Sequence, residues 1–271
     1  MAIRNLESLF PGHSNFWISF FCKSLYGFLI LKILTSWSTL LDIAIYVPYT
    51  FPSAYAHLLY APLHILQLSV ACYLFCFLGV LLISLFIRTN YISAVLIFWF
   101  SVSLSRFMFP VLNGSDLVLN LYLLLSIALP TWPLFNSGSK GYQEAISSVA
   151  ILFARITLCL IYFLSGYDKL INTDWRSGAA IHSIINLDYF FNPSFSFSGS
   201  TTLFMLIGWG VIIFELSFSF LVWFKQLRVL LLVAGTLFHL GIILLLGLPD
   251  FGLLMIICYS IFMPIKKESL R

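Results

Sequence analysis

The chain has 271 residues, of which 61% are hydrophobic and only 9% are charged. A soluble domain of this length has roughly a quarter of its residues charged, so the composition excludes an ordinary soluble globular protein. The net charge of +4 is small, and its positive residues cluster in predicted loops, so we expect no nucleic-acid partner. The sequence lacks short segments of alternating polarity between polar turns, which favours membrane helices over strands.

Long apolar segments follow one another along the chain. A membrane-spanning helix needs about 20 apolar residues. The candidate segments lie at 15–45, 62–87, 91–111, 116–135, 146–171, 202–224, 229–247 and 250–265. The first is too long for one straight span, and Pro48, Pro52 and Pro62 mark where regular helix stops. We therefore predict an all-α, polytopic transmembrane helical bundle of about eight spans, forming a single domain over 1–271.

The distribution of lysine and arginine predicts how the bundle is oriented. With the N-terminus inside, the inner loops hold Arg4, Arg88, Lys140, Lys225, Arg228, Lys266, Lys267 and Arg271. The outer loops hold little besides Lys169 and Arg176. This bias predicts that both termini are cytoplasmic. The connection at 172–201 then faces outward, and its aromatic residues predict a segment lying in the membrane interface. We expect no cleaved signal peptide.

Ionisable residues inside the predicted spans are candidates for function, because charge in hydrocarbon is costly. Glu215 lies about 10 residues before the inner turn at 225–228, and His239 about 11 after it, which places both roughly 15–16 Å from that turn. Two antiparallel neighbours would bring them together, either as a polar pair that locks the helices or as a pair that carries protons or binds a ligand. The cations Lys23, Lys32 and Arg106 are interpreted as snorkelling to the nearest surface.

Lys169 ends the fifth apolar segment, beside Asp168 and shortly before an Asp-Trp turn at Trp175. One interpretation is an interfacial lysine that snorkels outward. The other is a base, which needs an amine without its proton. Desolvation by aromatic residues such as Tyr162 and Trp175 disfavours the charged form of a lysine, whereas a nearby carboxylate stabilises it. For a base we therefore expect the Asp168 side chain to point away from the amine.

The run Tyr-Phe-Leu-Ser-Gly-x-x-Lys-Leu from Tyr162, followed by Asp-Trp-x-x-Gly from Asp174, resembles a known membrane domain. This domain is shared by vitamin K-dependent gamma-carboxylases and their bacterial relatives, the horizontally transferred transmembrane (HTTM) family. The Asn-Gly-Ser-Asp turn at 113–116, Glu215, and the Phe-His pair at 238–239 also resemble the family pattern. In the carboxylases the motif lysine deprotonates the reduced quinone cofactor. The resemblance therefore implies Lys169 as the base.

The same resemblance implies reduced vitamin K or another quinone as cofactor, bound near Tyr162, Trp175 and Asn120. The carboxylases have a histidine near the start of the fourth span that assists the lysine, and Asn120 is the nearest position here. The five cysteines lie in apolar segments without ligand spacing, so we expect no metal. A multi-pass protein of a bacterial plasma membrane is expected.

Two functions stay open. The first is an enzyme-like protein, of the gamma-carboxylase type of lyase, with Lys169 as base in an outward-facing quinone pocket. The second is a non-catalytic membrane component for maturation or export of a secreted peptide, as implied by short relatives of the sporulation-delaying protein B type. The carboxylases continue into a large domain that binds the substrate peptide. The expected partners here are membrane lipid and either a secreted peptide or a separate extramembrane protein.

Overall fold

The computed structural model of the chain describes residues 15–46, 69–87, 90–107, 113–129, 140–187 and 199–263. Within these ranges every regular element is a helix, which confirms the predicted all-α class. The chain divides into two compact units, one formed by Met1–Leu152 with Met263–Arg271 and the other by Phe153–Phe262. Each unit is described by itself.

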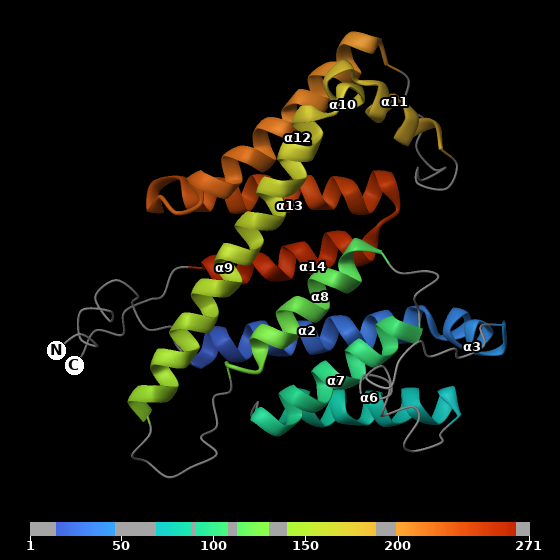
Figure 1. Cartoon of the computed structure of the whole chain (residues 1–271), viewed down its shortest axis with the longest axis vertical. Coiled ribbons are helices and arrows are strands. Elements are labelled where there is room, and N and C mark those ends of the chain that lie inside the picture. The colour runs from blue at the N-terminus through green and yellow to red at the C-terminus, as the bar shows by residue number, and fades with distance from the viewer. Residues whose placement is uncertain are drawn as a thin grey trace. The chain divides into compact units, whose positions relative to one another are not determined.

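The first unit contains α2 (Asn15–Thr35), α3 (Trp37–Tyr46), α6 (Val70–Phe86), α7 (Tyr91–Phe107) and α8 (Gly114–Ser126). Helix α9 (Lys140–Ile171) begins there and continues into the second unit. The second unit adds α10 (Thr173–Ser177), α11 (Ala179–Asn186), α12 (Thr201–Leu221), α13 (Lys225–Leu246), α14 (Pro249–Tyr259) and the short 3-10 turn η3 (Ser260–Phe262). Figure 1 shows their order by colour.

Among the described residues, four helices are long and apolar enough to cross a membrane. They are Trp17–Thr35, Ala145–Ile171, Thr201–Leu221 and Lys225–Leu246. Four shorter apolar helices of 10–17 residues follow the other predicted segments: Val70–Phe86, Tyr91–Arg106, Gly114–Ser126 and Pro249–Phe262. The long first segment is divided between α2 and α3, and Pro48, Pro52 and Pro62 lie outside the described residues. The total of eight spans stays a prediction.

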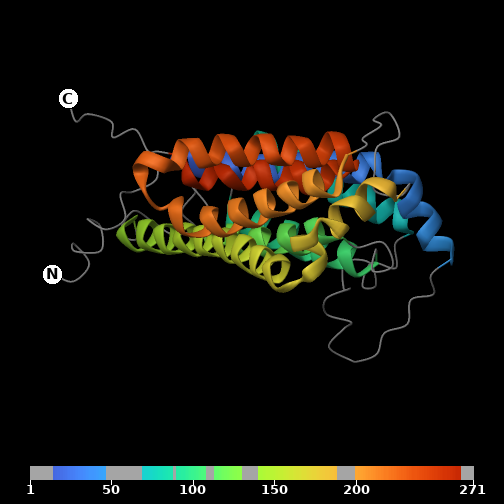
Figure 2. The same ribbon diagram turned by 90° about the horizontal axis from the view of Figure 1, so that it is seen from above.

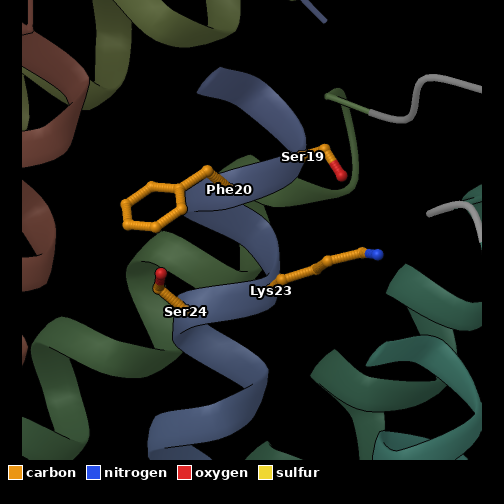
Figure 3. Close-up of a pocket in the computed structure, with 4 residues that line it drawn as sticks. All are labelled: Ser19, Phe20, Lys23 and Ser24. Carbon is orange, nitrogen blue, oxygen red and sulfur yellow. The ribbon is translucent and has the colours of Figure 1, made fainter. Parts of the chain in front are cut away.

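Helix α2 packs on α6 and α8 in the first unit, and α7 packs on α6 and α8. Its core contains stacked rings: Tyr73 and Phe77 both lie 5.2 Å from Phe100, measured between ring centroids. A pocket of about 420 Å³ opens on α2 beside Ser19, Phe20, Lys23 and Ser24. Ser19 and Lys23 point to one side of the helix and Phe20 to the other (Figure 3). This pocket contains none of the residues predicted to form the site.

In the second unit, α14 packs back against α13, and the two run side by side in both views (Figures 1 and 2). Gly247 ends α13 in the left-handed conformation, with φ of 61°, and Pro249 is among the first residues of α14. Glycine at a helix end and proline at a helix start are the residues that such a turn favours. The short helices α10 and α11 lie on α12 at the end of α9 (Figure 1).

Candidate functional site

Lys169 lies in the last turn of α9, as predicted, and its amine is paired with a carboxylate from α12. The Lys169 Nζ lies 2.9 Å from Oε2 of Glu215 and 3.1 Å from Oε1. One turn earlier on α9, the Ser165 hydroxyl accepts a hydrogen bond from the same amine at 2.5 Å. The lysine side chain is 16% exposed and the glutamate side chain 7%. The pair is therefore almost buried but still reachable on the lysine side.

Trp175 covers the amine from α10. The Asn172 side chain caps this helix by accepting a hydrogen bond from the Asp174 backbone N–H at 2.9 Å. The cap starts α10 directly after α9, and the Trp175 ring centre then lies 5.0 Å from the Lys169 Nζ. A cation over an indole face at this distance is attracted by the ring quadrupole. Asp168 is exposed, which agrees with the expectation that it points away from the amine.

The carboxylate changes what the site does chemically. An aromatic wall alone would favour the uncharged amine, whereas Glu215 in direct contact stabilises the ammonium form. The two groups also form a charge-assisted hydrogen bond along which a proton can move over a very short distance. When Glu215 holds that proton, Lys169 is a neutral amine whose lone pair accepts a hydrogen bond from the glutamic acid, so the lone pair reaches a third group only after the acid proton turns away. The pair thus contains a proton donor, the Lys169 ammonium, in direct contact with a proton acceptor, the Glu215 carboxylate.

A second polar cluster lies earlier on the same face of α9. The Tyr162 hydroxyl is 2.6 Å from Nε2 of His239 and also hydrogen-bonded to the Tyr259 hydroxyl. Tyr162, His239 and Tyr259 are at most 2% exposed. Tyr162 was predicted as a wall of the cofactor site, but its hydroxyl is occupied by these two partners.

The predicted direct pairing of Glu215 with His239 is not the arrangement found. Both are buried, but in the described residues Glu215 binds Lys169 and Ser165, while His239 binds Tyr162. Equal distance from the turn fixed how deep each residue lies along its helix. It did not fix the direction in which each side chain points around the helix axis, and α9 presents a better partner to each.

Asn120 lies in α8 of the first unit, where its amide group has two side-chain partners on α7. Its oxygen accepts a hydrogen bond from the Ser101 hydroxyl and its nitrogen donates one to Ser105, both at 2.7 Å. These bonds tie α7 to α8. Whether Asn120 takes the place of the assisting histidine of the carboxylases stays a prediction.

The interpretation of Lys32 as a snorkelling cation is wrong. Its Nζ lies 2.6 Å from Oδ1 of Asp116, and both side chains are 5% exposed. Asp116 also accepts a hydrogen bond from the Asn113 backbone N–H in the capping box that starts α8. The sequence contained one indication of this pair. Asp116 lies in the first turn of α8, where the capping box holds its carboxylate in place, and the packing of α8 on α2 then buries it as a partner for Lys32.

The comparisons with known proteins give one result that covers almost the whole chain. The HTTM domain family matches residues 17–266, a range that includes both ion pairs and the whole Lys169 motif. No curated protein and no solved structure has a significant match to the chain. The family match agrees with the apolar helices and with the motif around Lys169. The chain therefore belongs to the HTTM domain family, and it is a membrane protein of that family.

Proposed function

We propose that this HTTM-family protein is an enzyme-like membrane protein in which Lys169, with Glu215, accepts a proton from an acidic hydroxyl of a quinone-class cofactor. The observation that carries the proposal is the contact of Lys169 with Glu215 and Ser165 beneath the Trp175 ring. Its residues fit such a group: the indole offers a flat apolar wall, and Lys169, whose side chain is 16% exposed, offers the acceptor.

Each of the residues has a separate role in this proposal. Glu215 first takes a proton from the Lys169 ammonium, which leaves a neutral amine beside a neutral acid. Once the acid proton turns away from the nitrogen, this amine would be the acceptor for the proton of a bound hydroxyl and would become an ammonium again. Ser165 holds the Lys169 Nζ in place throughout. A reduced quinone would supply the acidic hydroxyl. In a medium of low dielectric constant, both proton positions in the pair avoid an isolated buried charge.

The test uses purified protein in lipid nanodiscs, mixed without oxygen with menadiol, the reduced form of a small soluble quinone. The absorption spectrum reports how much of the bound menadiol has lost a proton. We expect the wild-type protein to stabilise the deprotonated form, and Lys169→Arg to reduce this by about 100-fold, because a guanidinium does not act as a base. Lys225→Arg is the control, since Lys225 is an exposed lysine at the start of α13. Deprotonation that survives Lys169→Arg would contradict the proposal.

A second candidate function is the non-catalytic component for maturation or export of a secreted peptide. It is favoured by the fact that the Lys169 amine already has several protein acceptors, the Ser165 carbonyl included, as a structural ion pair does. In that case Lys169→Arg retains peptide production in cells, and the menadiol spectrum does not change with the wild-type protein. The two measurements together distinguish the candidates.

A further inference from the structure

Three glycines lie in the segments that carry Lys169, Trp175 and Glu215, and at each of them another chain segment comes closer to an added Cβ atom than ordinary van der Waals contact. Gly166 follows Ser165 on α9, Gly178 joins α10 to α11, and Gly208 lies on α12. A helix interior disfavours glycine relative to alanine, so a close approach of another segment is the physical reason to expect glycine at 166 and 208.

Gly166 brings α9 close to α12 at the level of the carboxylate. A Cβ atom at this position would lie 3.0 Å from Cγ of Leu216 and 3.1 Å from Cβ of Glu215. Both distances are tighter than ordinary van der Waals contact. Because Ser165 and Lys169 lie on either side of Gly166 in the sequence, this approach sets how far the amine reaches to meet Glu215.

Gly208 and Gly178 fix α10 and α11 on α12. A Cβ atom at Gly208 would collide with the backbone carbonyl of Trp175, and one at Gly178 with the backbone of Phe204 and Met205. Gly178 also has φ of 84°, a conformation that residues with side chains rarely adopt.

The two contacts on α12 lie one helical turn apart, at 204–205 and at 208. Residues 208, 212 and 215 follow the same helical face, since neighbours on a face recur every three or four residues. Because α10 touches α12 both at Trp175 and at Gly178, it can neither shift along α12 nor rotate about a single contact. The face that receives α10 is therefore the face that carries Glu215, and Trp175 is held over the amine rather than left free to swing away.

We propose that Gly166, Gly178 and Gly208 are positioning residues of the Lys169 site. By allowing close contact of α9 and α10 with α12, they set the reach of the amine to Glu215 and hold the Trp175 ring as the wall that limits access to it. That Lys169 is a functional residue rests on the proposed function, whereas the positioning of Trp175 and Glu215 around it can be measured without any activity.

The experiment measures the rate at which trinitrobenzenesulfonate labels Lys169 in the purified protein in nanodiscs, by peptide mass spectrometry. The exposed Lys225 provides an internal reference for reagent activity. Gly208→Ala forces the Trp175 backbone away from α12, and the relative labelling rate of Lys169 should rise roughly tenfold, as expected when a packed segment opens locally. Gly210→Ala is the matched control, because it lies on the same helix and nothing lies within 4 Å of the added Cβ.

Trp175→Ala provides a second arm that introduces no backbone collision. It should raise Lys169 labelling to the same extent, and the double variant with Gly208→Ala should add little, since both changes remove the same wall. Equal labelling in Gly208→Ala and Gly210→Ala overturns the proposal, and so does a Trp175→Ala protein that labels like the wild type. If Gly208→Ala does not accumulate in the membrane, Trp175→Ala decides alone. Loss of menadiol deprotonation with unchanged labelling would instead concern the proposed function.

Discussion

Among the residues that the structure describes, each unit contains one buried lysine–carboxylate pair, and the two pairs differ in how exposed their side chains are. Lys32 and Asp116 are both 5% exposed, whereas Lys169 is 16% exposed and Glu215 7%. Asp116 is held by the start of its own helix, while the Lys169 amine contacts a serine and an aromatic ring. We infer that the first pair is structural and that the second is the one available to a ligand.

The burial of the Lys32–Asp116 pair predicts that the two residues are strongly coupled in their effect on stability. Lys32→Met leaves Asp116 buried without its partner and should lower stability by about 3–5 kcal/mol. Adding Asp116→Asn should restore a large part of that loss, because no buried charge then lacks a partner. Thermal unfolding of the four proteins in detergent measures the cycle. Simple addition of the two single losses would show that the pair does not carry the stability.

The hydroxyl of Tyr162 predicts a second measurable effect. Tyr162→Phe keeps the ring but removes the partner of Nε2 of His239, whose Nδ1 also has no hydrogen-bond partner in the described residues. A buried polar group left without partners costs about 1–3 kcal/mol, so we expect a loss of that size. Tyr73→Phe serves as a comparison, since the Tyr73 hydroxyl donates to the Phe100 carbonyl rather than to an ionisable group. If His239→Leu and Tyr162→Phe are fully additive, the two side chains are not coupled.

At the scale of elements, a glycine inside α13 and the glycine that ends it differ in what they do. Gly241 lies inside α13 with nothing within 4 Å of an added Cβ, whereas Gly247 ends the helix with φ of 61°. Gly241→Ala should therefore stabilise the protein by about 0.5–1 kcal/mol through helix propensity. Gly247→Ala should destabilise it by about 1 kcal/mol or more through backbone strain. Melting temperatures that move in the same direction for both variants would contradict this assignment.

At the scale of the whole molecule, the loop charges predict that both termini are cytoplasmic. In a background without native cysteines, a single cysteine in place of Ser194 should react with a membrane-impermeant maleimide added from outside. One in place of Lys140 should react only after the membrane is opened. Because 172–201 faces outward in this topology, the same labelling tests on which side Lys169 opens. The reverse pattern would mean that the orientation is inverted.

The sequence was enough to predict the class of protein and the place of the main motif. Burying backbone in hydrocarbon requires helices, so apolar segments of sufficient length predict them directly. The Lys169 motif ends α9 as expected, and its glycines and tryptophan now have physical roles at the contact with α12. The number of spans stays open, since four of the apolar helices are 10–17 residues long.

What only the tertiary structure decided is which buried polar groups meet. Periodicity and residue counts give the depth of a side chain along its own helix, and this placed Glu215 and His239 correctly inside the protein. They carry no information on how neighbouring helices are rotated against one another, and that rotation selects the partner. Glu215 therefore binds Lys169 rather than His239, and Lys32 binds Asp116 rather than reaching a surface, because a buried charge is stable only where packing brings it an opposite one.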